Sequence, residues 1–189
     1  MKIIGGKLKG RNFFMPKGTR PTPDIVRKAL FDILGQDLTG LSFIDLFAGS
    51  GAVGLEAISR NAKRVMFVES DSRCCEIISQ NLTTLGITPY ETPRISFHLL
   101  NTDVFAAVKQ LSKATERFDI VFIDPPYYRE LAKKTLKTLV AYDIVCPTCF
   151  IALQHDKREI LPATEGRFLI VKQRKYGSSV LTVYKNQDT

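Results

Sequence analysis

The sequence predicts an α/β fold with a doubly wound, mostly parallel sheet of seven strands and an antiparallel hairpin at its C-terminal edge. From residue 41 onward, short apolar runs of strand length alternate with runs that have helical spacing. Such alternation produces right-handed β-α-β units, with helices on both faces of a parallel sheet. The last two apolar runs are separated only by a short turn around Gly177, so they predict an antiparallel pair. The composition, 44% hydrophobic and 24% charged, is that of a globular domain.

The N-terminal region precedes this alternation. Residues 1–15 place short apolar pairs among glycines and lysines, which predicts a small β-hairpin. After a loop, Thr22, Pro23 and Asp24 predict the start of a helix. Proline suits the first helical turn, and aspartate suits the positive end of the helix dipole.

The alternating elements follow in order. Runs rich in β-branched and aromatic residues predict strands, and runs with apolar residues three or four positions apart predict helices. The expected strands are 41–47, 64–69, 94–100, 118–123, 149–154, 167–175 and 179–184, and the expected helices between them are 53–60, 72–85, 104–111 and 129–139. We therefore divide the chain into a basic N-terminal extension, residues 1–19, and one α/β domain, residues 20–189.

Positive charge is concentrated near the two ends of the chain, whose net charge is +8. Residues 1–28 hold eight Lys or Arg and one acidic residue, and residues 157–185 hold seven basic and two acidic residues. An evenly solvated surface is the simpler interpretation of any one basic run. The asymmetry between ends and middle favours contact of both ends with a polyanion, most simply nucleic acid.

Membrane, secreted and metal-binding classes receive no support from the sequence. No apolar run approaches the roughly 18 to 20 residues that a membrane span needs, and the N-terminus lacks an apolar signal region. We expect a cytoplasmic protein with reduced thiols. Cys146 and Cys149 have C-x-x-C spacing, but no second such pair and no suitably spaced histidine accompanies them. We therefore expect no metal.

A glycine-rich turn follows the first predicted strand of the alternating region. Residues 45–54 read D-L-F-A-G-S-G-A-V-G and match G-x-G-x-x-G, with Glu69 at the end of the next strand where an acid would bind ribose. A dinucleotide is one candidate ligand. Asp45, however, would repel a pyrophosphate at the helix start, and Phe47 narrows the turn. S-adenosylmethionine, with a ribose, an adenine, an amino group and a sulfonium but no phosphate, fits better.

Two further predicted strand ends carry candidate residues. Asp103 follows the third strand and could accept a hydrogen bond from the adenine amino group, while Val104 donates its backbone N–H. A plain helix N-cap is an equally good interpretation of Asp103. The fourth strand ends in D-P-P-Y, residues 124–127, where two prolines make a rigid turn.

The D-P-P-Y stretch suits chemistry on an exocyclic amino group. Asp124 and the Pro125 carbonyl could each accept one N–H of such a group on a nucleobase and aim its nitrogen at the cofactor methyl. Tyr127 would offer a flat face to the unstacked base. A purely structural turn is the alternative for D-P-P-Y alone, but the upstream glycine turn at the correct interval favours the catalytic interpretation.

These motifs, in this order, resemble a known family. The chain resembles the Rossmann-like class I S-adenosylmethionine-dependent methyltransferases, and more narrowly the bacterial 16S rRNA guanine-N2 methyltransferases that modify guanine 966 of the small-subunit RNA. The resemblance extends from residue 2 to about residue 185. It rests on K-I-I-G-G-K-L-K-G-R (2–11), R-P-T-P-D-I-V-R-K-A-L-F (20–31), D-L-F-A-G-S-G-A-V-G-L-E-A (45–57), F-V-E-S-D (67–71), F-D-I-V-F-I-D-P-P-Y (118–127) and R-K-Y-G-S-S-V-L (174–181).

The resemblance implies a role for each of these stretches. The cofactor would be held by Arg20, Thr22, Asp45, Phe47, Gly49, Gly51, Glu69, Ser70, Asp103 and Val104. The target guanine would be held by Asp124, Pro125 and Tyr127, and RNA phosphates by Lys2, Lys7, Lys9 and Arg11. The implied partner is 16S rRNA in a small subunit or an assembly intermediate. Apart from the resemblance, we expect no DNA and no membrane as partners, and nothing in the sequence suggests more than a monomer. One departure is L-Q-H-D at 153–156, where a more acidic V-E-x-E pattern is expected, and His155 is interpreted as a loop residue.

The sequence leaves two alternatives open. The first is an amino-methyltransferase with another target, either DNA adenine N6 or a protein glutamine. No residues are left for a separate element that would read DNA bases in the major groove, and glutamine modifiers resemble N-P-P-Y instead of D-P-P-Y. The second alternative is a non-catalytic RNA-binding assembly factor that keeps the fold, which cofactor binding would test.

Overall fold

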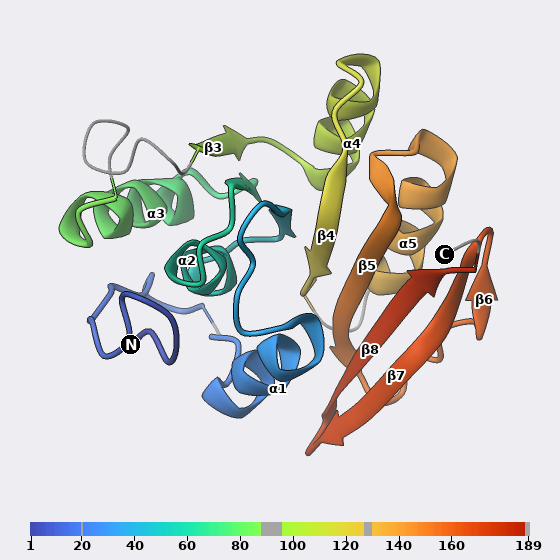
Figure 1. The fold of residues 1–189 in the computed structure, drawn as a ribbon, viewed down its shortest axis with the longest axis horizontal. Coiled ribbons are helices and arrows are strands. Elements are labelled where there is room, and N and C mark those ends of the chain that lie inside the picture. The colour runs from blue at the N-terminus through green and yellow to red at the C-terminus, as the bar shows by residue number, and fades with distance from the viewer. Residues whose placement is uncertain (20, 88–95, 127–129, 188–189) are drawn as a thin grey trace.

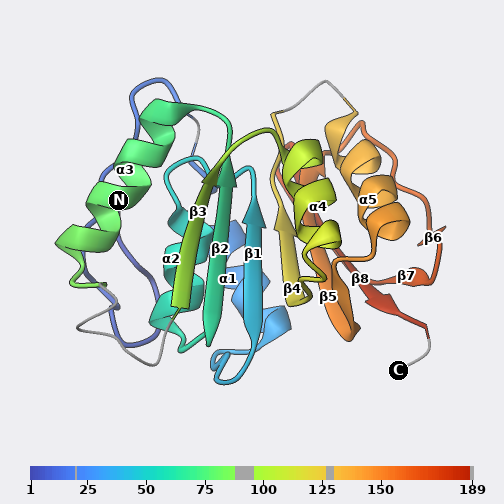
Figure 2. The same cartoon turned by 90° about the horizontal axis from the view of Figure 1, so that it is seen from above.

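A computed structural model describes residues 1–19, 21–87, 96–126 and 130–187 of the 189-residue chain. Its centre is one eight-stranded sheet with the strand order β3-β2-β1-β4-β5-β8-β7-β6. Helices α1, α2 and α3 pack on one face of the sheet, and α4 and α5 pack on the other (Figures 1 and 2). The architecture confirms the predicted doubly wound α/β fold.

The elements follow the predicted alternation closely. The strands are β1 (Ser42–Leu46), β2 (Arg64–Glu69), β3 (Ser96–Asn101), β4 (Phe118–Ile123), β5 (Val145–Asp156), β6 (Thr164–Glu165), β7 (Phe168–Tyr176) and β8 (Ser179–Asn186). The helices are α1 (Asp24–Leu34), α2 (Ala52–Ser59), α3 (Ser72–Thr84), α4 (Val104–Lys113) and α5 (Leu131–Tyr142).

The sheet has a parallel half and an antiparallel half. Strands β3, β2, β1, β4 and β5 are parallel, and β8 then pairs antiparallel with both β5 and β7. The predicted C-terminal hairpin is confirmed. The sheet has eight strands where the sequence predicted seven, because the two-residue β6 pairs with the start of β7. A strand of two residues is too short to show an alternating pattern.

The start of β5 also differs from the prediction. The sequence suggested Cys149, but the strand begins at Val145, four residues earlier. Pro147 lies between these two positions, and a proline normally excludes a central strand because it cannot donate to the ladder. The structure accommodates Pro147 at an irregularity, where the register with β4 shifts between the pairs Phe118↔Val145 and Ile120↔Phe150.

The N-terminal segment, residues 1–15, is fastened to α1, α2 and α3. Its two arms meet in a single described bridge, Lys2↔Asn12, so the hairpin is short. Ile3 and Phe13 are buried and belong to the core cluster on the α1–α3 face of the sheet. The turn between the arms lies close against α2: Gly6 has a φ of +72°, and a Cβ there would lie 2.0 Å from the Ser59 carbonyl oxygen. Glycine is required at such a contact.

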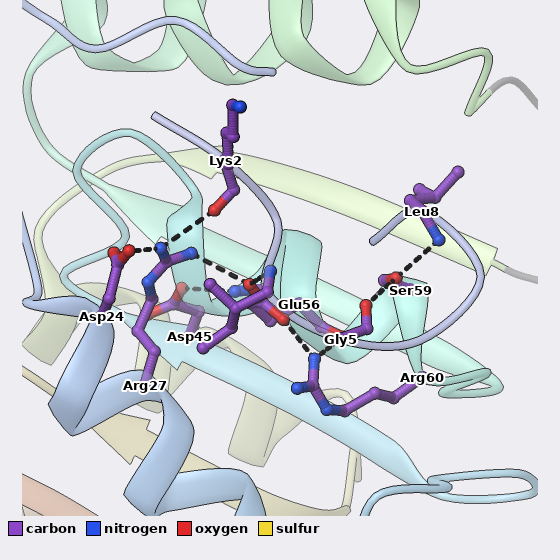
Figure 3. Close-up of polar contacts among 11 residues, drawn as sticks. Lys2, Gly5, Leu8, Asp24, Arg27, Asp45, Glu56, Ser59 and Arg60 are labelled. Atoms are coloured by element: carbon purple, nitrogen blue, oxygen red, sulfur yellow. Dashed lines mark hydrogen bonds and ion pairs between the residues drawn. The ribbon is translucent and has the colours of Figure 1, made fainter. Parts of the chain in front are cut away.

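Buried polar side chains complete this attachment (Figure 3). The fully buried Glu56 carboxylate accepts the Ile4 N–H at 2.6 Å and pairs with the guanidinium groups of Arg27 and Arg60. Arg27 also donates to the Lys2 carbonyl oxygen, 3.0 Å away. A buried carboxylate is stable only when it is paired in this way. The N-terminal segment is therefore a fixed part of the α1–α2 surface.

Candidate active site

A cavity of about 660 Å³ lies where the parallel strands β1, β2 and β4 end. Ligands of doubly wound sheets bind at this edge. Its lining includes nine of the residues that the sequence singled out for cofactor or substrate: Thr22, Asp45, Phe47, Gly49, Glu69, Ser70, Asp103, Asp124 and Pro125. These residues come from five separate parts of the chain, so the fold brings the predicted cofactor-binding and substrate-binding residues together in one cavity.

The first wall of the cavity, the turn wall, consists of residues 45–54 and Glu69. Within it, the Asp45 carboxylate accepts a hydrogen bond from the Gly54 N–H at 3.0 Å. Gly54 lies in the first turn of α2, where backbone N–H groups otherwise lack partners. A Cβ on Gly54 would lie 2.2 Å from the Phe67 ring, so only glycine lets α2 pack this closely on β2. Asp45 therefore occupies the helix start that a phosphate would use in a dinucleotide site.

Glu69 fixes the shape of the same wall. One of its carboxylate oxygens accepts the Gly49 N–H at 2.8 Å, and the other accepts the Asp71 N–H at 2.9 Å. This links the glycine turn after β1 to the end of β2. A carboxylate that is held at both oxygens presents its remaining lone pairs in fixed directions, as a ribose-binding acid must.

The position of Asp103 is compatible with both predicted roles, the helix N-cap and the acceptor for the adenine amino group. It is the N-cap of α4, because its side chain accepts the backbone N–H groups of Phe105 and Ala106 at 2.9 and 3.2 Å. Asp103 and Phe105 also line the cavity. One Asp103 oxygen makes both capping bonds, and the residue remains exposed at the cavity edge.

The second wall, the D-P-P wall, consists of Asp124, Pro125 and Pro126 at the end of β4, together with Thr22. Asp124 is half-buried and Pro125 is buried. The Thr22 hydroxyl donates to Asp124 Oδ2 at 2.8 Å, joining residues 102 positions apart. The sequence assigned Thr22 to the cofactor, and the structure adds a direct contact with the predicted catalytic carboxylate.

The charged side chains that line the cavity within the described residues are all acidic. Five acids line it, and among the described residues of its lining there is no Lys or Arg: the acids are Asp45, Glu69, Asp71, Asp103 and Asp124. Burial raises the pKa of Asp45 from 3.8 to about 7; the hydrogen bond from Gly54 opposes this shift, and the charges of Asp124 and Glu69 add to it. A cationic ligand would relieve this concentration of charge.

The lining distinguishes between the two candidate cofactors. A dinucleotide needs a free helix N-terminus for its pyrophosphate, and here the Asp45 carboxylate already accepts the amide at that position. S-adenosylmethionine carries a sulfonium and an amino group and has no phosphate. The acidic lining and the occupied helix start fit S-adenosylmethionine and oppose a dinucleotide.

Some predicted residues lie elsewhere. Gly51 is the buried N-cap of α2. The Val104 side chain packs into the core on the α4–α5 face, and the cofactor contact predicted for its backbone N–H stays a prediction. Arg20 and Tyr127 fall outside the residues that the structure describes. The four predicted RNA contacts are exposed on the N-terminal segment, away from the cavity lining: Lys2, Lys7, Lys9 and Arg11.

Sequence reasoning assigned no site role to three of the lining residues, and noted Gln154 only as part of the L-Q-H-D departure from the family pattern. Phe105, Cys74 and Gln154 lie at the cavity, and Phe105 offers it an aromatic side chain close to Asp103. Burial raises the pKa of the Cys74 thiol to about 11, so the thiol stays protonated and is no nucleophile at neutral pH. The position of Phe105 two residues after Asp103 was the one available signal, and an aromatic residue in a helix's first turn is ordinarily interpreted as core.

His155 lies in a strand, which corrects its interpretation as a loop residue. It is buried in β5, with Nδ1 3.0 Å from the Asp156 carbonyl oxygen and Nε2 2.9 Å from the Thr182 hydroxyl. Since a carbonyl can only accept, Nδ1 carries the proton and Nε2 accepts from Thr182. Burial lowers the pKa of His155, so it is a neutral cross-strand contact.

The cysteines and the helices concern two further classes, metal-binding and membrane proteins. Cys146 and Cys149 both lie near the start of β5 as free thiols. Across the described ranges, no group of three or more His, Cys, Asp or Glu residues is arranged to hold a metal ion. None of the helices within those ranges combines the length and hydrophobicity required to cross a bilayer.

Comparison with known sequences gives full-length relatives. Ribosomal RNA small subunit methyltransferase D of Escherichia coli (strain K12) is 30% identical over 189 residues, covering 99% of this chain and 90% of the relative. The protein of the same name from Haemophilus influenzae is 30% identical over 188 residues, covering 98% and 94%. YlbH of Bacillus subtilis (strain 168), named provisionally as an rRNA methyltransferase, is 32% identical over 189 residues and is covered completely.

Comparison with solved structures agrees with the comparison of sequences. A hypothetical protein of Thermus thermophilus superposes with a TM-score of 0.80 at 32% identity, covering 97% of this chain and 98% of that one. An RNA methyltransferase from Salinibacter ruber, solved in complex with S-adenosyl-L-homocysteine, has a TM-score of 0.65 at 16% identity over 90% of this chain and 95% of its own, which shows a shared fold.

A family model settles the relationship. The model described as conserved hypothetical protein 95 matches residues 1–185, which includes both walls of the cavity and the N-terminal segment. Together with the full-length relatives, this match shows that the chain belongs to the conserved hypothetical protein 95 family.

Proposed function

We propose that this chain transfers a methyl group from S-adenosylmethionine to the exocyclic N2 of a guanine in 16S rRNA of the small ribosomal subunit. It is an S-adenosylmethionine-dependent methyltransferase, and its substrate is RNA. The observation that carries the proposal is the single cavity shared by the turn wall and the D-P-P wall. Cofactor-binding and base-binding groups must meet in one place for methyl transfer.

The cofactor and the residues of the turn wall have complementary charges. When bound, S-adenosylmethionine supplies a methyl group already activated by its sulfonium. In our proposal Glu69 binds the ribose, Asp103 and Phe105 bind the adenine, and Asp45 favours the positive charges. Because the donor is activated, most of the catalysis that remains for the protein is positioning.

Asp124 performs that positioning in the D-P-P wall. The lone pair of a guanine amino nitrogen is delocalised into the ring, so the nitrogen is a weak nucleophile. Asp124 and the Pro125 carbonyl each accept one of its N–H bonds and direct the nitrogen toward the methyl group. During methyl transfer, the Asp124 carboxylate would hold one N–H of the amino group, and the resulting ammonium would release its proton to water.

Thr22 and Tyr127 both assist Asp124 in this proposal. Thr22 donates to Asp124 Oδ2 and thereby fixes the plane of the carboxylate. Tyr127 is proposed to stack on the flipped base, as the sequence predicted. Arg20 completes the cofactor side in the same proposal.

The form of the substrate is also a proposal. We infer that the enzyme acts in the cytoplasm, as a monomer, on an assembled small subunit or an assembly intermediate. The basic N-terminal extension, residues 1–19, would contact RNA. Its phosphate contacts would be Lys2, Lys7, Lys9 and Arg11, which the fixed N-terminal segment holds in place. Faster methylation of protein-free 16S RNA than of the particle would contradict the particle as substrate, and light scattering would reveal a dimer.

The decisive experiment is methyl transfer from labelled S-adenosylmethionine to small subunits from cells lacking this enzyme. The modified nucleoside is identified by mass spectrometry, and Asp124→Asn serves as the matched control because it keeps the size of the side chain. We expect N2-methylguanosine with the natural protein and almost none with the variant. Cofactor binding without any product on the particle would overturn the rRNA assignment while keeping the fold and cofactor.

A further inference from the structure

We propose that Lys172 and Arg174 on β7 form a second RNA-contacting surface, which binds phosphates of the RNA that carries the target guanine. We call these two residues the β7 patch. The inference rests on the proposed function and adds a contact at the opposite end of the chain from the N-terminal segment.

Exposure and charge are the first support. Residues 171–175 of β7 are exposed along a run that includes three cations, Lys172, Arg174 and Lys175. Of the acidic residues that the structure describes, none forms an ion pair with Lys172 or Arg174. Their charge is therefore available to a polyanion.

The free edge of β7 is the second support. The short β6 pairs only with Phe168 and Leu169, so the rest of the strand forms the rim of the sheet. Exposed edge strands usually carry charged residues that prevent pairing with other chains. That function alone would not require the charges to favour one face of the sheet.

Cross-strand pairing assigns each cation to a face. Lys172 pairs with Val183 and Arg174 with Leu181. Both partners belong to the core cluster under α1–α3, so the β7 patch lies on that face. The N-terminal segment packs into the same cluster. Lys175 alternates to the other face of the sheet. The β7 patch and the predicted RNA contacts of the N-terminal segment therefore share one face.

The patch is also close to the catalytic edge. The β7–β8 turn lies beside the end of β5, because Ser179 pairs with Asp156. β7 is three strand spacings from β4, or about 14 Å, which puts the patch near the D-P-P wall. In Figures 1 and 2, α1 lies between the N-terminal segment and the β7–β8 hairpin. RNA that enters the cavity past α1 would contact the N-terminal segment on one side and the β7 patch on the other.

The test compares two double variants of equal charge. Lys172→Ala/Arg174→Ala removes the β7 patch, and Lys113→Ala/Lys137→Ala removes two exposed lysines from α4 and α5 on the other face. Binding to small subunits that lack the methyl group is measured as a function of salt, alongside methyl transfer. Thermal unfolding and S-adenosylmethionine binding confirm that each variant is folded.

We expect the patch variant to bind about tenfold more weakly, with a salt slope smaller by about 1.4 to 1.8, since each lost phosphate contact removes about 0.7 to 0.9. The control and Lys175→Ala should bind like the natural protein. An unchanged slope, or an equal loss in the control, overturns the β7 patch. A weaker affinity with unchanged slope assigns the patch to a ribosomal protein and also overturns it. Absence of methyl transfer by the natural protein would refute the proposed function separately, because binding is measured independently.

Discussion

The two walls of the cavity are built in opposite ways. In the turn wall, the polar groups that bind one another lie at most 20 positions apart in the sequence: Asp45 accepts from Gly54, and Glu69 accepts from Gly49 and Asp71. In the D-P-P wall, Asp124 is half-buried and receives Thr22 from a segment 102 residues away. The contacts of the turn wall all lie within residues 45–71, whereas the contact between Thr22 and Asp124 in the D-P-P wall depends on how the N-terminal region docks.

The largest expected effect is at the D-P-P wall. Asp124→Asn keeps the shape of the side chain but replaces one accepting oxygen by a donor, so it should lower kcat by about 10² to 10³-fold. Affinity for S-adenosylmethionine, measured by calorimetry, should stay within about twofold because the turn wall is intact. A variant that loses cofactor affinity instead would show that the two walls do not act separately.

The turn wall should respond through stability. Gly54→Ala places a Cβ 2.2 Å from the Phe67 ring, so α2 must shift, at a cost of about 1–3 kcal/mol of unfolding free energy. Chemical denaturation measures the change. The double variant Gly54→Ala/Phe67→Leu should recover part of the loss, since it removes the ring that clashes. A single variant as stable as the natural protein would contradict the close packing of α2 on β2.

Asp45 gives the turn wall a pH dependence. Its pKa of about 7 means that it is mostly protonated at pH 6 and mostly ionised at pH 8. If the ionised form binds the cationic cofactor, affinity should fall about tenfold from pH 8 to pH 6. Asp45→Asn should remove this dependence and leave only the titration of the cofactor's own amino group. A natural protein with the same pH profile as Asp45→Asn would refute the assignment.

The stability of the cofactor-free protein should change in the other direction. The folded chain holds the Asp45 proton more tightly than the unfolded chain, because burial raises its pKa above 3.8. This contribution to stability is complete below about pH 4 and is lost as the pH rises to about 7. Thermal unfolding of the natural protein and of Asp45→Asn over this range separates it from the contributions of other groups.

The smallest effect is expected at Thr22. Thr22→Val keeps the shape of the side chain but removes the hydrogen bond to Asp124 Oδ2, and should lower kcat by about three- to tenfold. The KM for S-adenosylmethionine should stay unchanged, and Thr22→Ser should restore activity. A rise in that KM with kcat intact would instead favour the cofactor contact that the sequence predicted for Thr22.

The sequence predicted the parts of the molecule that local patterns determine. The bounds of β2 and β4 match the expected runs 64–69 and 118–123 residue for residue, because buried parallel strands are continuous apolar runs. The same patterns located the glycine turn and D-P-P at neighbouring strand ends. They could not locate contacts set by tertiary packing, such as Thr22 with Asp124 or Glu56 with Ile4.

The sequence patterns did not predict which polar residues are buried. Asn81 is completely buried on α3, accepts the Phe14 N–H, and donates to the carbonyl oxygens of Phe14 and Ser50. It therefore joins the N-terminal segment to the glycine turn. In the sequence an asparagine at this position is expected to face solvent, since no local pattern shows which polar side chains will find partners after folding.

These long-range partners determine when the N-terminal segment can acquire its structure during synthesis. Its backbone bonds to Glu56, Ser59 and Asn81 join residues 52, 51 and 67 positions apart. The segment is synthesised before α2 and α3, so it stays without these partners until both helices have been made. The lysines proposed to grip RNA are thus held in place only after the helix that begins at the cofactor site exists, so a nascent chain cannot present its RNA-binding surface before its catalytic domain has begun to fold.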